Sequence, residues 1–353
     1  MSTSSAQPLP VLAAQADPAV AADAARLADE AIGPRDIRAV KTLRVSVTDR
    51  CNLRCTYCMP AEGMKWIPKG ELLDFDEIVS VAQTAIGLGV RNFKITGGEP
   101  LLRQEVETLV ARLHELPGVG ELSLTTNGLL LAERAEALKQ AGIRRVTVSL
   151  DTLRADRFRE LTRTGQIEKV WEGIEAAEAA GLSPLKLNVV VLRDTNLDEV
   201  ADFAGMTRDS MRQVRFIEFM PLGASKALTG ADQFVPYDEI RSAIERVHGP
   251  LTPTDQDAGD GPARHFRIPG ATGKLGFIHA MSAPFCSTCN RLRLTPEGQL
   301  RSCLFDGGEV DLKPLLRAPA QPGALRQAFI DCVRLKPDRH QMYGNRQMSQ
   351  IGG

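Results

Sequence analysis

The sequence predicts an α/β protein in which short strands alternate with amphipathic helices around a parallel sheet. From Lys41 onward, runs rich in β-branched residues alternate with helical stretches, which is typical of repeated βα units. Several helical stretches end at a glycine where a helix C-cap is expected, namely Gly89, Gly142 and Gly181. The 353 residues are 43% hydrophobic, so the chain can bury the core of a barrel enzyme.

Six strands are expected, in the order Leu43–Val47, Asn92–Thr96, Glu121–Thr125, Arg145–Leu150, Leu185–Leu192 and Val214–Phe219. Helices such as Asp76–Leu88 and Ala132–Ala141 connect them. The Asp-, Gly- and Pro-rich segment from Thr252 to Pro262 is expected to be a loop or linker. Two short strands should follow, His265–Ile268 and Lys274–His279, and then a hairpin across Arg291–Cys303.

Three regions are expected along the chain. Residues 1–40 are rich in alanine and fit neither a secretory signal nor a transit peptide, so we expect a mobile extension with at most a short helix over Ala19–Ile32. Residues 41–250 hold the predicted βα units around a parallel sheet, which the repeat alone leaves as a closed barrel or an open sheet. Residues 251–353 form a C-terminal region that carries three further cysteines and ends in two glycines.

The composition excludes several classes of protein. The net charge of -1 and the isoelectric point near 6.6 give no general attraction to nucleic acid or to an anionic membrane, so we expect a small-molecule substrate. No apolar run approaches the roughly 18 to 20 residues of a membrane span. Seven cysteines in two groups of three, with Cys332 left over, do not suit a disulfide framework. We expect a cytoplasmic protein, with Cys332 as a small buried hydrophobe.

The first cysteine triad is Cys51, Cys55 and Cys58, with CxxxCxxC spacing. Soft thiolates select iron-sulfur clusters, zinc or copper(I) over hard cations. A cubane of four irons needs four ligands, so three thiolates leave one iron open, and the neighbouring Tyr57 favours a cluster that binds a small molecule. A structural zinc loop is the alternative, but no fourth Cys or His follows Cys58 until His114.

The second triad is Cys286, Cys289 and Cys303. The predicted hairpin returns Cys303 towards Cys289, and it places Arg291 and Arg293 on one face because side chains two apart on a strand point the same way. Three thiolates would again leave one iron of a cluster open. The alternative is a structural zinc site with His279 as a fourth ligand.

Polar or glycine-rich residues occur at the carboxyl ends of the strands, where parallel sheets place their chemistry. They are the cysteine loop, Gly97–Pro100, Thr125–Gly128, Ser149–Asp151, Lys186 with Asn188, and Arg215 with Glu218 and Met220. Each alone is compatible with ordinary turn chemistry. Together on one rim, next to a metal loop, they indicate a single pocket.

Three charged residues lie inside predicted strands, Lys94, Lys186 and Arg215. A buried charge without a partner is costly, so each needs a counter-charge. Either an anionic substrate supplies it, or salt bridges to Glu218 or Asp151 do.

The stretch Leu43–Pro60 resembles the signature of the radical SAM superfamily, and its Cys-Met-Pro ending is most similar to the GTP 3′,8-cyclase (MoaA) family. The resemblance extends from Lys41 to Gly353. It implies a partial (β/α)6 TIM-type barrel of the radical SAM type, with a C-terminal lobe that carries a second iron-sulfur cluster. It further implies two 4Fe-4S clusters and S-adenosyl-L-methionine as cofactors. The implied reaction converts GTP to 3′,8-cyclo-7,8-dihydroguanosine 5′-triphosphate, the first step of molybdopterin biosynthesis.

The resemblance also assigns roles to residues of this chain. It makes the first triad the ligands of the SAM cluster and the second triad the ligands of a cluster that faces the guanine base. The implied SAM contacts are Tyr57, Gly98, Ser149 and Met220. The implied GTP contacts are Arg44, Lys94, Thr125, Lys186, Arg215, Arg291 and Arg293. The final Gly352 and Gly353 are expected to enter the active site and to be needed for activity.

The expected partners are GTP, an electron donor such as flavodoxin or ferredoxin, and cyclic pyranopterin monophosphate synthase (MoaC family) as the downstream enzyme. No nucleic acid or membrane partner is expected, and the chain is expected to be a monomer or a homodimer. Two alternative functions remain open at this point. One is a radical SAM enzyme for a peptide or another nucleoside, with a filled second cluster; the other is a non-catalytic zinc-binding regulator or scaffold.

Overall fold

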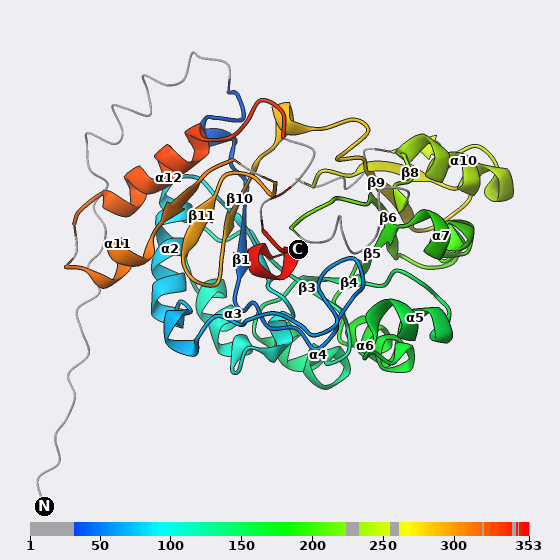
Figure 1. Ribbon diagram of the computed structural model, residues 1–353, viewed down its shortest axis with the longest axis horizontal. Helices are drawn as coiled ribbons and strands as arrows, with labels where there is room; N and C mark the ends of the chain where they lie inside the picture. Colours follow the sequence, from blue (N-terminus) through cyan, green and yellow to red (C-terminus); the bar gives the residue numbers. More distant parts are fainter. Residues whose placement is uncertain are drawn as a thin grey trace, which may run out of the picture. The chain divides into compact units, whose positions relative to one another are not determined.

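We describe the fold from a computed structural model, which covers residues 32–223, 233–254, 261–305, 307–319, 321–340, 344 and 346–352 (Figure 1). Contacts divide the chain into Met1–Ile32 and Gly33–Gly353, and the description concerns the second unit. Residues 1–31 of the expected mobile extension lie outside the described residues, whereas residues 32–40 are described and end in the fully buried Val40.

Six parallel strands form the centre of the sheet, within two residues of the predicted bounds. They are β1 (Thr42–Ser46), β2 (Asn92–Thr96), β3 (Glu121–Thr126), β4 (Arg145–Ser149), β5 (Lys186–Val191) and β6 (Gln213–Glu218). Each pairs in parallel with the next strand along the chain. This succession requires a helical crossover between strands, which the predicted βα repeat provides.

The C-terminal strands extend this sheet at both edges. β10 (Arg291–Leu294) pairs in parallel with β1 and leads to antiparallel β11 (Gln299–Arg301) and β12 (Glu309–Asp311). At the other edge, β9 (Lys274–Ile278) pairs in parallel with β6 and leads to β8 (Arg264–Arg267) and β7 (Thr252–Pro253). The described strands therefore form one sheet in the order β12-β11-β10-β1-β2-β3-β4-β5-β6-β9-β8-β7.

The predictions for this region are partly right. The two short strands and the hairpin are present, because β8, β9 and the β10–β11 pair fall where they were expected. The segment from Thr252 was wrongly predicted to be loop from its first residue, since Thr252 and Pro253 form β7. Pairing with β8 supplies the order that the local composition does not indicate. The boundary at residue 250 stays a prediction.

The helices between the strands are α2 (Phe75–Gly87), α3 (Val106–His114), α4 (Leu131–Gln140), α5 (Ala155–Thr162), α6 (Ile167–Ala179), α7 (Arg193–Asn196) and α8 (Val200–Gly205). After β6 come α10 (Tyr237–His248), α11 (Lys313–Arg317), α12 (Ala324–Arg334) and α13 (Met348–Ile351). Short 3-10 turns include η1 (Ile37–Ala39), η2 (Lys69–Glu71), η3 (Pro100–Leu102), η4 (Leu197–Glu199) and η6 (Cys286–Thr288). In Figure 1 the crossover helices follow the sheet on its outer side. Among the described residues, no helix combines the length and apolar character needed to cross a membrane.

Local sequence explains where the crossover helices begin and end. Asp74 and Glu77 form a capping box at the start of α2. Gly89, Gly142 and Gly181 follow α2, α4 and α6 with positive φ values of 95°, 111° and 73°, so the predicted glycine C-caps are confirmed.

The two faces of the central strands differ in chemistry. Leu43 and Val45 of β1 and Phe93 and Ile95 of β2 are fully buried in the hydrophobic core beneath the helices. The residues that alternate with them, such as Arg44, point to the opposite face. Polar and charged side chains are therefore concentrated on the inner face of the sheet.

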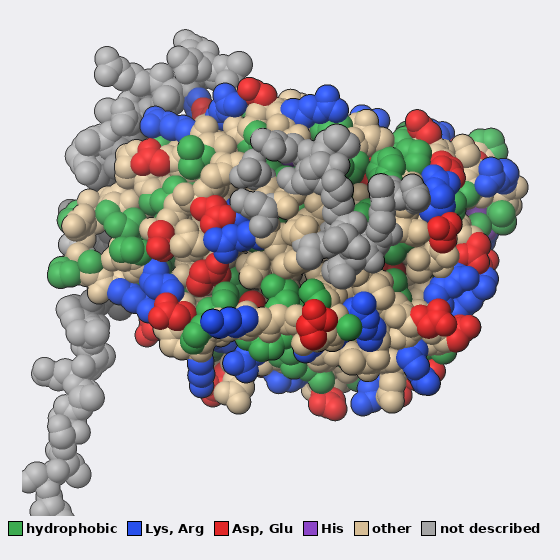
Figure 2. All heavy atoms as spheres, viewed as in Figure 1, with side chains coloured by type: hydrophobic (Ala, Val, Ile, Leu, Met, Phe, Trp, Pro, Cys, Tyr) green, Lys and Arg blue, Asp and Glu red, His purple; other side chains and the backbone are tan. Residues whose placement is uncertain are grey.

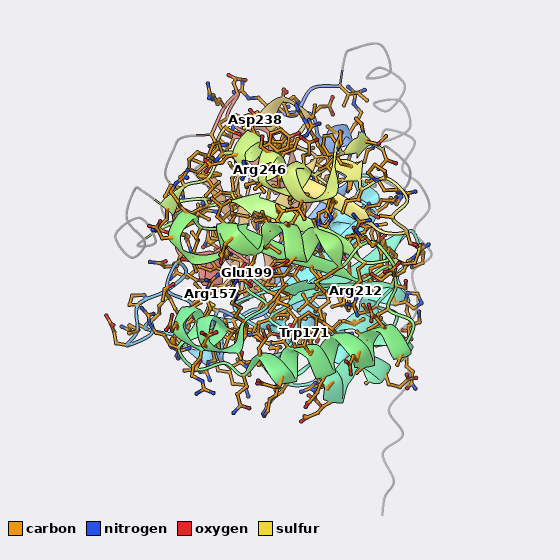
Figure 3. All side chains as sticks on the ribbon, turned by 90° about the vertical axis from the view of Figure 1, so that its right-hand side faces the viewer. Arg157, Trp171, Glu199, Arg212, Asp238 and Arg246 are labelled. Atoms are coloured by element: carbon orange, nitrogen blue, oxygen red, sulfur yellow. The ribbon has the colours of Figure 1, made fainter. Side chains whose placement is uncertain are left out.

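Outside the inner face, a buried carboxylate is paired with a cation, whereas charges on the surface are mixed. Figure 3 shows Arg157 of α5 beneath Glu199 of η4, and Arg157 Nη1 lies 2.5 Å from Glu199 Oε1. Glu199 also accepts hydrogen bonds from Thr152 Oγ1 at 2.7 Å and from Leu153 N at 2.6 Å, which fixes the loop after β4. On the face seen in Figure 2, acidic and basic side chains are interspersed, in keeping with the small net charge.

Candidate active site

The first cysteine triad lies on the loop that follows β1. Cys58 N and Met59 N both donate to the carbonyl oxygen of Cys55, at 2.9 and 3.1 Å, which folds the loop into a turn. The loop is tied to the end of α5, because Thr56 N donates to Leu161 O at 2.9 Å. All three sulfurs are thiols, and the local sequence thus presents them on one short, folded loop.

These three thiols lie close together, and each is partly buried. Burial raises the pKa of Cys51 to about 11 and that of Cys58 to about 12. Burial also raises the pKa of Cys55 well above its ordinary value, and the neighbouring sulfurs of Cys58 and Cys51 add to the shift. Without a cation they are neutral thiols, whereas a cationic iron centre would favour their thiolate forms.

The glycines after β2 are required by close approach to this loop. Gly98 N donates to Thr48 O at 2.7 Å and Glu99 N donates to Arg50 O at 2.7 Å. A Cβ at Gly98 would overlap the backbone oxygens of Arg50 and Asp49, which precede Cys51 directly. This packing explains Gly98 without a ligand, and its contact to SAM stays a prediction.

Glu99 is a structural carboxylate that links the loops after β2 and β3. It is fully buried, and its two oxygens accept from Thr126 Oγ1 at 2.8 Å and from Asn127 N at 2.7 Å. Burial raises the pKa of Glu99 to about 7. Asn127 Nδ2 in turn lies 3.8 Å from Cys51 Sγ, so Glu99 orients a neighbour of the triad.

Tyr57 is anchored through its hydroxyl group. Tyr57 OH donates to Asp151 Oδ2 at 2.6 Å, and Val190 N donates to Asp151 Oδ1 at 2.7 Å. Burial raises the pKa of Asp151 to about 6, although both hydrogen bonds oppose the shift. The structure therefore joins the first cysteine loop to the carboxyl ends of β4 and β5.

Positively charged side chains gather on the inner face of the sheet. Lys94 Nζ and Arg215 Nη2 both lie near Thr147 Oγ1, at 3.3 and 3.4 Å. In the strand register, Arg44 stands between Lys94 of β2 and Arg293 of β10. The structure brings these predicted GTP contacts together at the centre of the sheet.

These cations lie near one another on the inner face, where Arg215 is buried and Arg44, Lys94 and Lys186 are partly buried. Burial lowers the pKa of Lys186 to about 7 and that of Arg215 to about 10, and other cations add to both shifts. Burial likewise lowers the pKa of Arg44 to about 9 and holds the pKa of Lys94 well below its usual range. The inner face is thus a positive, desolvated surface that an anion would stabilise.

The alternative of structural salt bridges does not account for Lys94, Lys186 and Arg215. Glu218 instead accepts from Tyr237 N and Met281 N, each at 2.8 Å, and from Ser282. Asp151 is engaged by Tyr57 and Val190, as described above. Within the described part of the chain, none of the three cations forms an ion pair with a carboxylate.

Some buried polar atoms on the same face have no hydrogen-bond partner among the described residues. They are Arg215 Nε, Thr125 Oγ1 and Asn188 Oδ1, and each is fully buried. Buried polar atoms in folded proteins are almost always satisfied. Both donors and acceptors are therefore available here to a polar ligand.

The second triad forms as the hairpin prediction requires. η6 begins at Cys286, and β10 pairs with β11 so that Cys303 returns to the other two cysteines. Burial raises the pKa of Cys286 above its ordinary value, and the nearby sulfurs of Cys303 and Cys289 contribute to the shift. Arg291 stacks over the ring of Phe285 at 5.2 Å, beside the triad.

The C-terminal residues lie between the two triads. Ser349 N in α13 makes a hydrogen bond with Cys58, which favours the thiolate of that residue. Gly352 has φ of 72°, and a Cβ there would be 2.6 Å from the methyl group of Thr96 at the end of β2. Arg293 donates to Gly352 O. Gly353 lies outside the described residues.

The remaining predicted SAM contacts lie at the same end of the sheet. Ser149 ends β4, and it stands opposite Asn188 of β5. Met220 follows β6 and packs against Leu222, Phe305 and Ile351.

One segment at the second triad was not predicted from the sequence. Lys336 Nζ donates to Cys289 O at 2.6 Å, and His340 N lies 3.4 Å from Cys286 Sγ. Both residues follow α12, far from the cysteines in sequence. A Lys and a His in a polar C-terminal stretch resemble surface residues, so no local pattern could have identified them.

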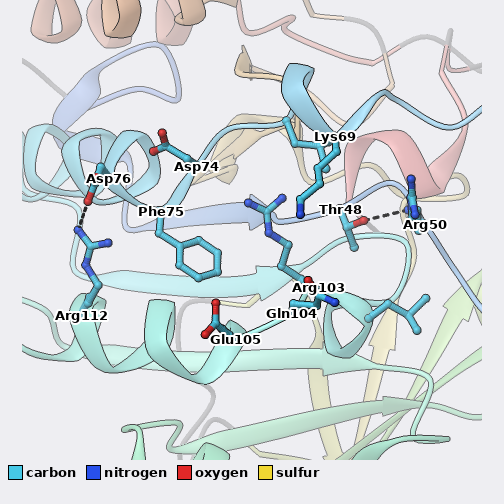
Figure 4. A pocket seen from close by; sticks show the side chains of 12 residues that line it. Thr48, Arg50, Lys69, Asp74, Phe75, Asp76, Arg103, Gln104, Glu105 and Arg112 are labelled. Carbon is cyan, nitrogen blue, oxygen red and sulfur yellow. Dashed lines mark hydrogen bonds and ion pairs between the residues drawn. The ribbon is translucent and has the colours of Figure 1, made fainter.

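Two hollows adjoin the site from outside. One, of about 520 Å³, is lined by Lys69, Arg103 and Arg50, which directly precedes Cys51; Figure 4 shows Arg103 and Lys69 pointing towards one another there. The other, of about 480 Å³, is lined by Cys289 and Arg291 among others. The inner-face cations Lys94, Lys186 and Arg215 line neither hollow, so we place the site by those side chains instead.

The donor sets fit clusters rather than single ions. Within the described residues, no three His, Cys, Asp or Glu side chains converge closely enough to hold one metal ion. Three thiols on one loop supply soft ligands to separate irons of a cubane. Cys51, Cys55 and Cys58 could hold one cluster in this way, and Cys286, Cys289 and Cys303 a second.

Known proteins resemble the chain over most of its length. Residues 45–206 match the radical SAM superfamily and residues 212–342 match the family Molybdenum Cofactor Synthesis C. The GTP 3′,8-cyclase of Pelotomaculum thermopropionicum is 51% identical over 320 residues, which are 90% of this chain and 98% of that protein. The chain belongs to the GTP 3′,8-cyclase family. The GTP 3′,8-cyclase of Moorella thermoacetica is 50% identical over the same shares of the two chains.

Membership of the GTP 3′,8-cyclase family confirms the resemblance found in the sequence. As a radical SAM family, it implies a 4Fe-4S cluster and S-adenosylmethionine. The crystal structure of Streptococcus suis SuiB bound to precursor peptide SuiA superimposes with a TM-score of 0.53 at 16% identity, over 85% of this chain and 65% of that one. This likeness concerns the fold alone. It supports the predicted partial barrel, whose sheet the C-terminal strands continue.

Proposed function

We propose that the chain converts GTP to 3′,8-cyclo-7,8-dihydroguanosine 5′-triphosphate, the first step of molybdenum cofactor biosynthesis. The observation that carries the proposal is the inner-face group of Lys94, Lys186 and Arg215, none of which forms an ion pair with a carboxylate among the described residues. A nucleoside triphosphate brings the negative charge that this surface lacks. The family relationship supports the same substrate.

In this proposal, the cations bind and orient GTP. Arginine is suited to the task because its planar fork matches phosphate oxygens. The proposed contacts are Arg44, Lys94, Thr125, Lys186, Arg215, Arg291 and Arg293. Their positions on β1, β2, β3, β5, β6 and β10 hold the substrate from many strands at once, which fixes the ribose and base for reaction.

The two triads have separate roles in the proposal. Cys51, Cys55 and Cys58 hold the cluster that binds SAM, with Tyr57, Gly98, Ser149 and Met220 around it. When bound, the cofactor would supply a 5′-deoxyadenosyl radical that takes up the ribose 3′ hydrogen as 5′-deoxyadenosine. C3′ would then bond to guanine C8, and one electron from the external donor with one proton would complete the dihydroguanosine. Cys286, Cys289 and Cys303 hold a second 4Fe-4S cluster that faces the base. Gly352 and Gly353 complete the active site from the C-terminal end.

The proposed setting follows from this chemistry. Reduced thiols and an electron donor such as flavodoxin or ferredoxin are needed, so we place the protein in the cytoplasm. The product would pass to cyclic pyranopterin monophosphate synthase. The chain acts as a monomer or a homodimer.

The test is an anaerobic assay with reconstituted protein, GTP, SAM and a reductant. We expect 5′-deoxyadenosine and a cyclised nucleotide. Formation of deoxyadenosine without consumption of GTP would reject the substrate. About eight irons per chain and no zinc would support two cubanes, whereas about four irons would reject the second. Arg293→Ala should abolish GTP binding while both clusters remain; loss of the second cluster would instead make Arg293 structural.

A further inference from the structure

Lys336 is a buried lysine at the second cysteine triad. It follows α12, and the residue is 3% exposed. Its Nζ donates to the carbonyl oxygen of Cys289 at 2.6 Å and lies 3.9 Å from Cys289 Sγ. The ammonium group therefore contacts both the backbone and the sulfur of one triad member.

A buried ammonium group needs a compensating negative charge. Among the described residues, Lys336 forms no ion pair with a carboxylate. The groups that its Nζ contacts both belong to Cys289, whose sulfur is 3.9 Å away. The available counter-charge of Lys336 is thus the thiolate of a triad member.

The residues after Lys336 contact the rest of the triad. His340 N lies 3.4 Å from Cys286 Sγ, and the His340 ring stacks on Phe305 with centroids 4.0 Å apart. A Cβ at Gly307 would overlap Cys303 Cβ and lie 3.1 Å from Pro337 Cδ, so Cys303 and this segment pack closely. Lys336–His340 therefore forms one wall of the triad.

We propose that Lys336 is a positioning residue of the second cluster, acting as counter-ion and hydrogen-bond donor to the thiolate of Cys289. The inference rests on the proposed function, because it requires that a cluster occupies this triad. A positive charge and a hydrogen bond at a ligand sulfur stabilise the reduced, more negative cluster. Lys336 therefore raises the reduction potential of the second cluster and slows loss of its iron.

The test isolates the second cluster in the full-length chain. Cys51, Cys55 and Cys58 are replaced by Ala, and the protein is reconstituted anaerobically to about four irons. In this background, Lys336→Met should lower the equilibrium constant for reduction of the cluster about tenfold. This change makes the reduction potential more negative by about 59 mV for one electron. Iron loss to a chelator should also accelerate. Lys336→Arg keeps the charge and should restore both values towards those of the parent.

Lys139→Met is the matched control. Lys139 Nζ also donates to a backbone carbonyl, that of Gly181 at 2.9 Å, but the residue is exposed and distant from both triads. It should change neither the potential nor iron loss. Lys336→Gln removes the charge and keeps a hydrogen-bond donor. If Lys336→Met does not fold, the reduction potential is measured in Lys336→Gln instead.

The outcomes separate this inference from the proposed function. If the protein without the first triad binds no iron, the proposed second cluster is rejected, and the role of Lys336 is rejected with it. If it binds about four irons but Lys336→Met and Lys336→Gln behave like Lys139→Met, the role of Lys336 is overturned and the second cluster stands. If only the charge-free Lys336 variants shift the potential, the inference is supported.

Discussion

The guanidinium group of Arg293 donates a hydrogen bond to the carbonyl oxygen of Gly352, and so joins the strand next to the second triad to the C-terminal residues. Arg293 is buried opposite Arg44, in a group of cations that repel one another. The backbone carbonyl offers a partial negative charge at this point. The position of the C-terminal residues and the electrostatics of the inner face are therefore linked.

Gly352→Ala should displace the C-terminal residues and lower GTP cyclisation by about tenfold or more, because a Cβ would lie 2.6 Å from the methyl group of Thr96. Both clusters should remain, as judged by iron content. Gly270→Ala is the matched control, since Gly270 has a similar φ of 78° but open space around the added Cβ. If both variants lost the same share of GTP cyclisation, backbone strain would explain the effect and the contact with Thr96 would not be needed.

GTP binding should weaken as pH rises above about 7, in part through Lys186. Burial lowers the pKa of this side chain to about 7 in the free protein, so it loses its proton above that pH. A bound triphosphate favours the charged form, so binding takes up a proton. The dissociation constant for GTP, measured from pH 6 to 9, should rise less steeply in Lys186→Arg than in the parent protein, because arginine stays charged. Equal pH dependence in the two proteins would contradict this role of Lys186, because the titration of GTP itself affects both proteins alike.

Lys94→Met should abolish GTP binding and yet stabilise the ligand-free protein. Lys94 is partly buried next to Arg215, Arg44 and Lys186, and desolvation and these charges depress its pKa. The sign follows from linkage: a lysine whose folded pKa is lowered destabilises the fold most at low pH, and that cost falls as pH rises towards 10.5.

Thermal unfolding at pH 7 checks this prediction. The gain for Lys94→Met should be about 1–4 kcal/mol, the range for replacing buried charges by apolar groups. It should shrink as the pH is raised. Lys139→Met, at an exposed site, should leave the melting temperature unchanged. A destabilised Lys94→Met protein would show that Lys94 has a structural role.

Glu218→Gln should loosen the segment that leads to the second triad. The Glu218 carboxylate is 1% exposed and accepts from Met281 N at 2.8 Å and from Ser282 N at 2.9 Å. An amide nitrogen cannot accept these bonds, so a loss of about 1–3 kcal/mol is expected. Iron release to a chelator should accelerate for about half of the iron. Glu71→Gln, at an exposed site, is the control.

The sequence predicted the elements whose signals are local. Alternation of β-branched residues located β1 to β6, and glycines located the ends of α2, α4 and α6. The pairing of β10 with β1 could not be read in this way, because it joins residues far apart in the chain. β7 was missed for the same reason, since its order comes from β8.

The candidate site divides along the same line. The cysteine spacings and the charges within strands could be read directly from residues such as Cys51 and Lys94. The anchoring of Tyr57 by Asp151 and the contact of Lys336 with Cys289 depend on tertiary packing. At Gly98, the backbone approaches Arg50 closely, which gives this glycine a packing role. The sequence motif alone does not distinguish that packing role from a role in ligand binding.

The parallel pairing of β1 with β10 has a consequence for biosynthesis. β1 is the first strand of the sheet to leave the ribosome, whereas β10 is made only after β9, when most of the chain has been translated. At about 5–20 residues per second, β1 stays an unpaired edge for many seconds. The first cysteine loop follows that edge directly, so it too is made well before the strand that completes this side of the sheet.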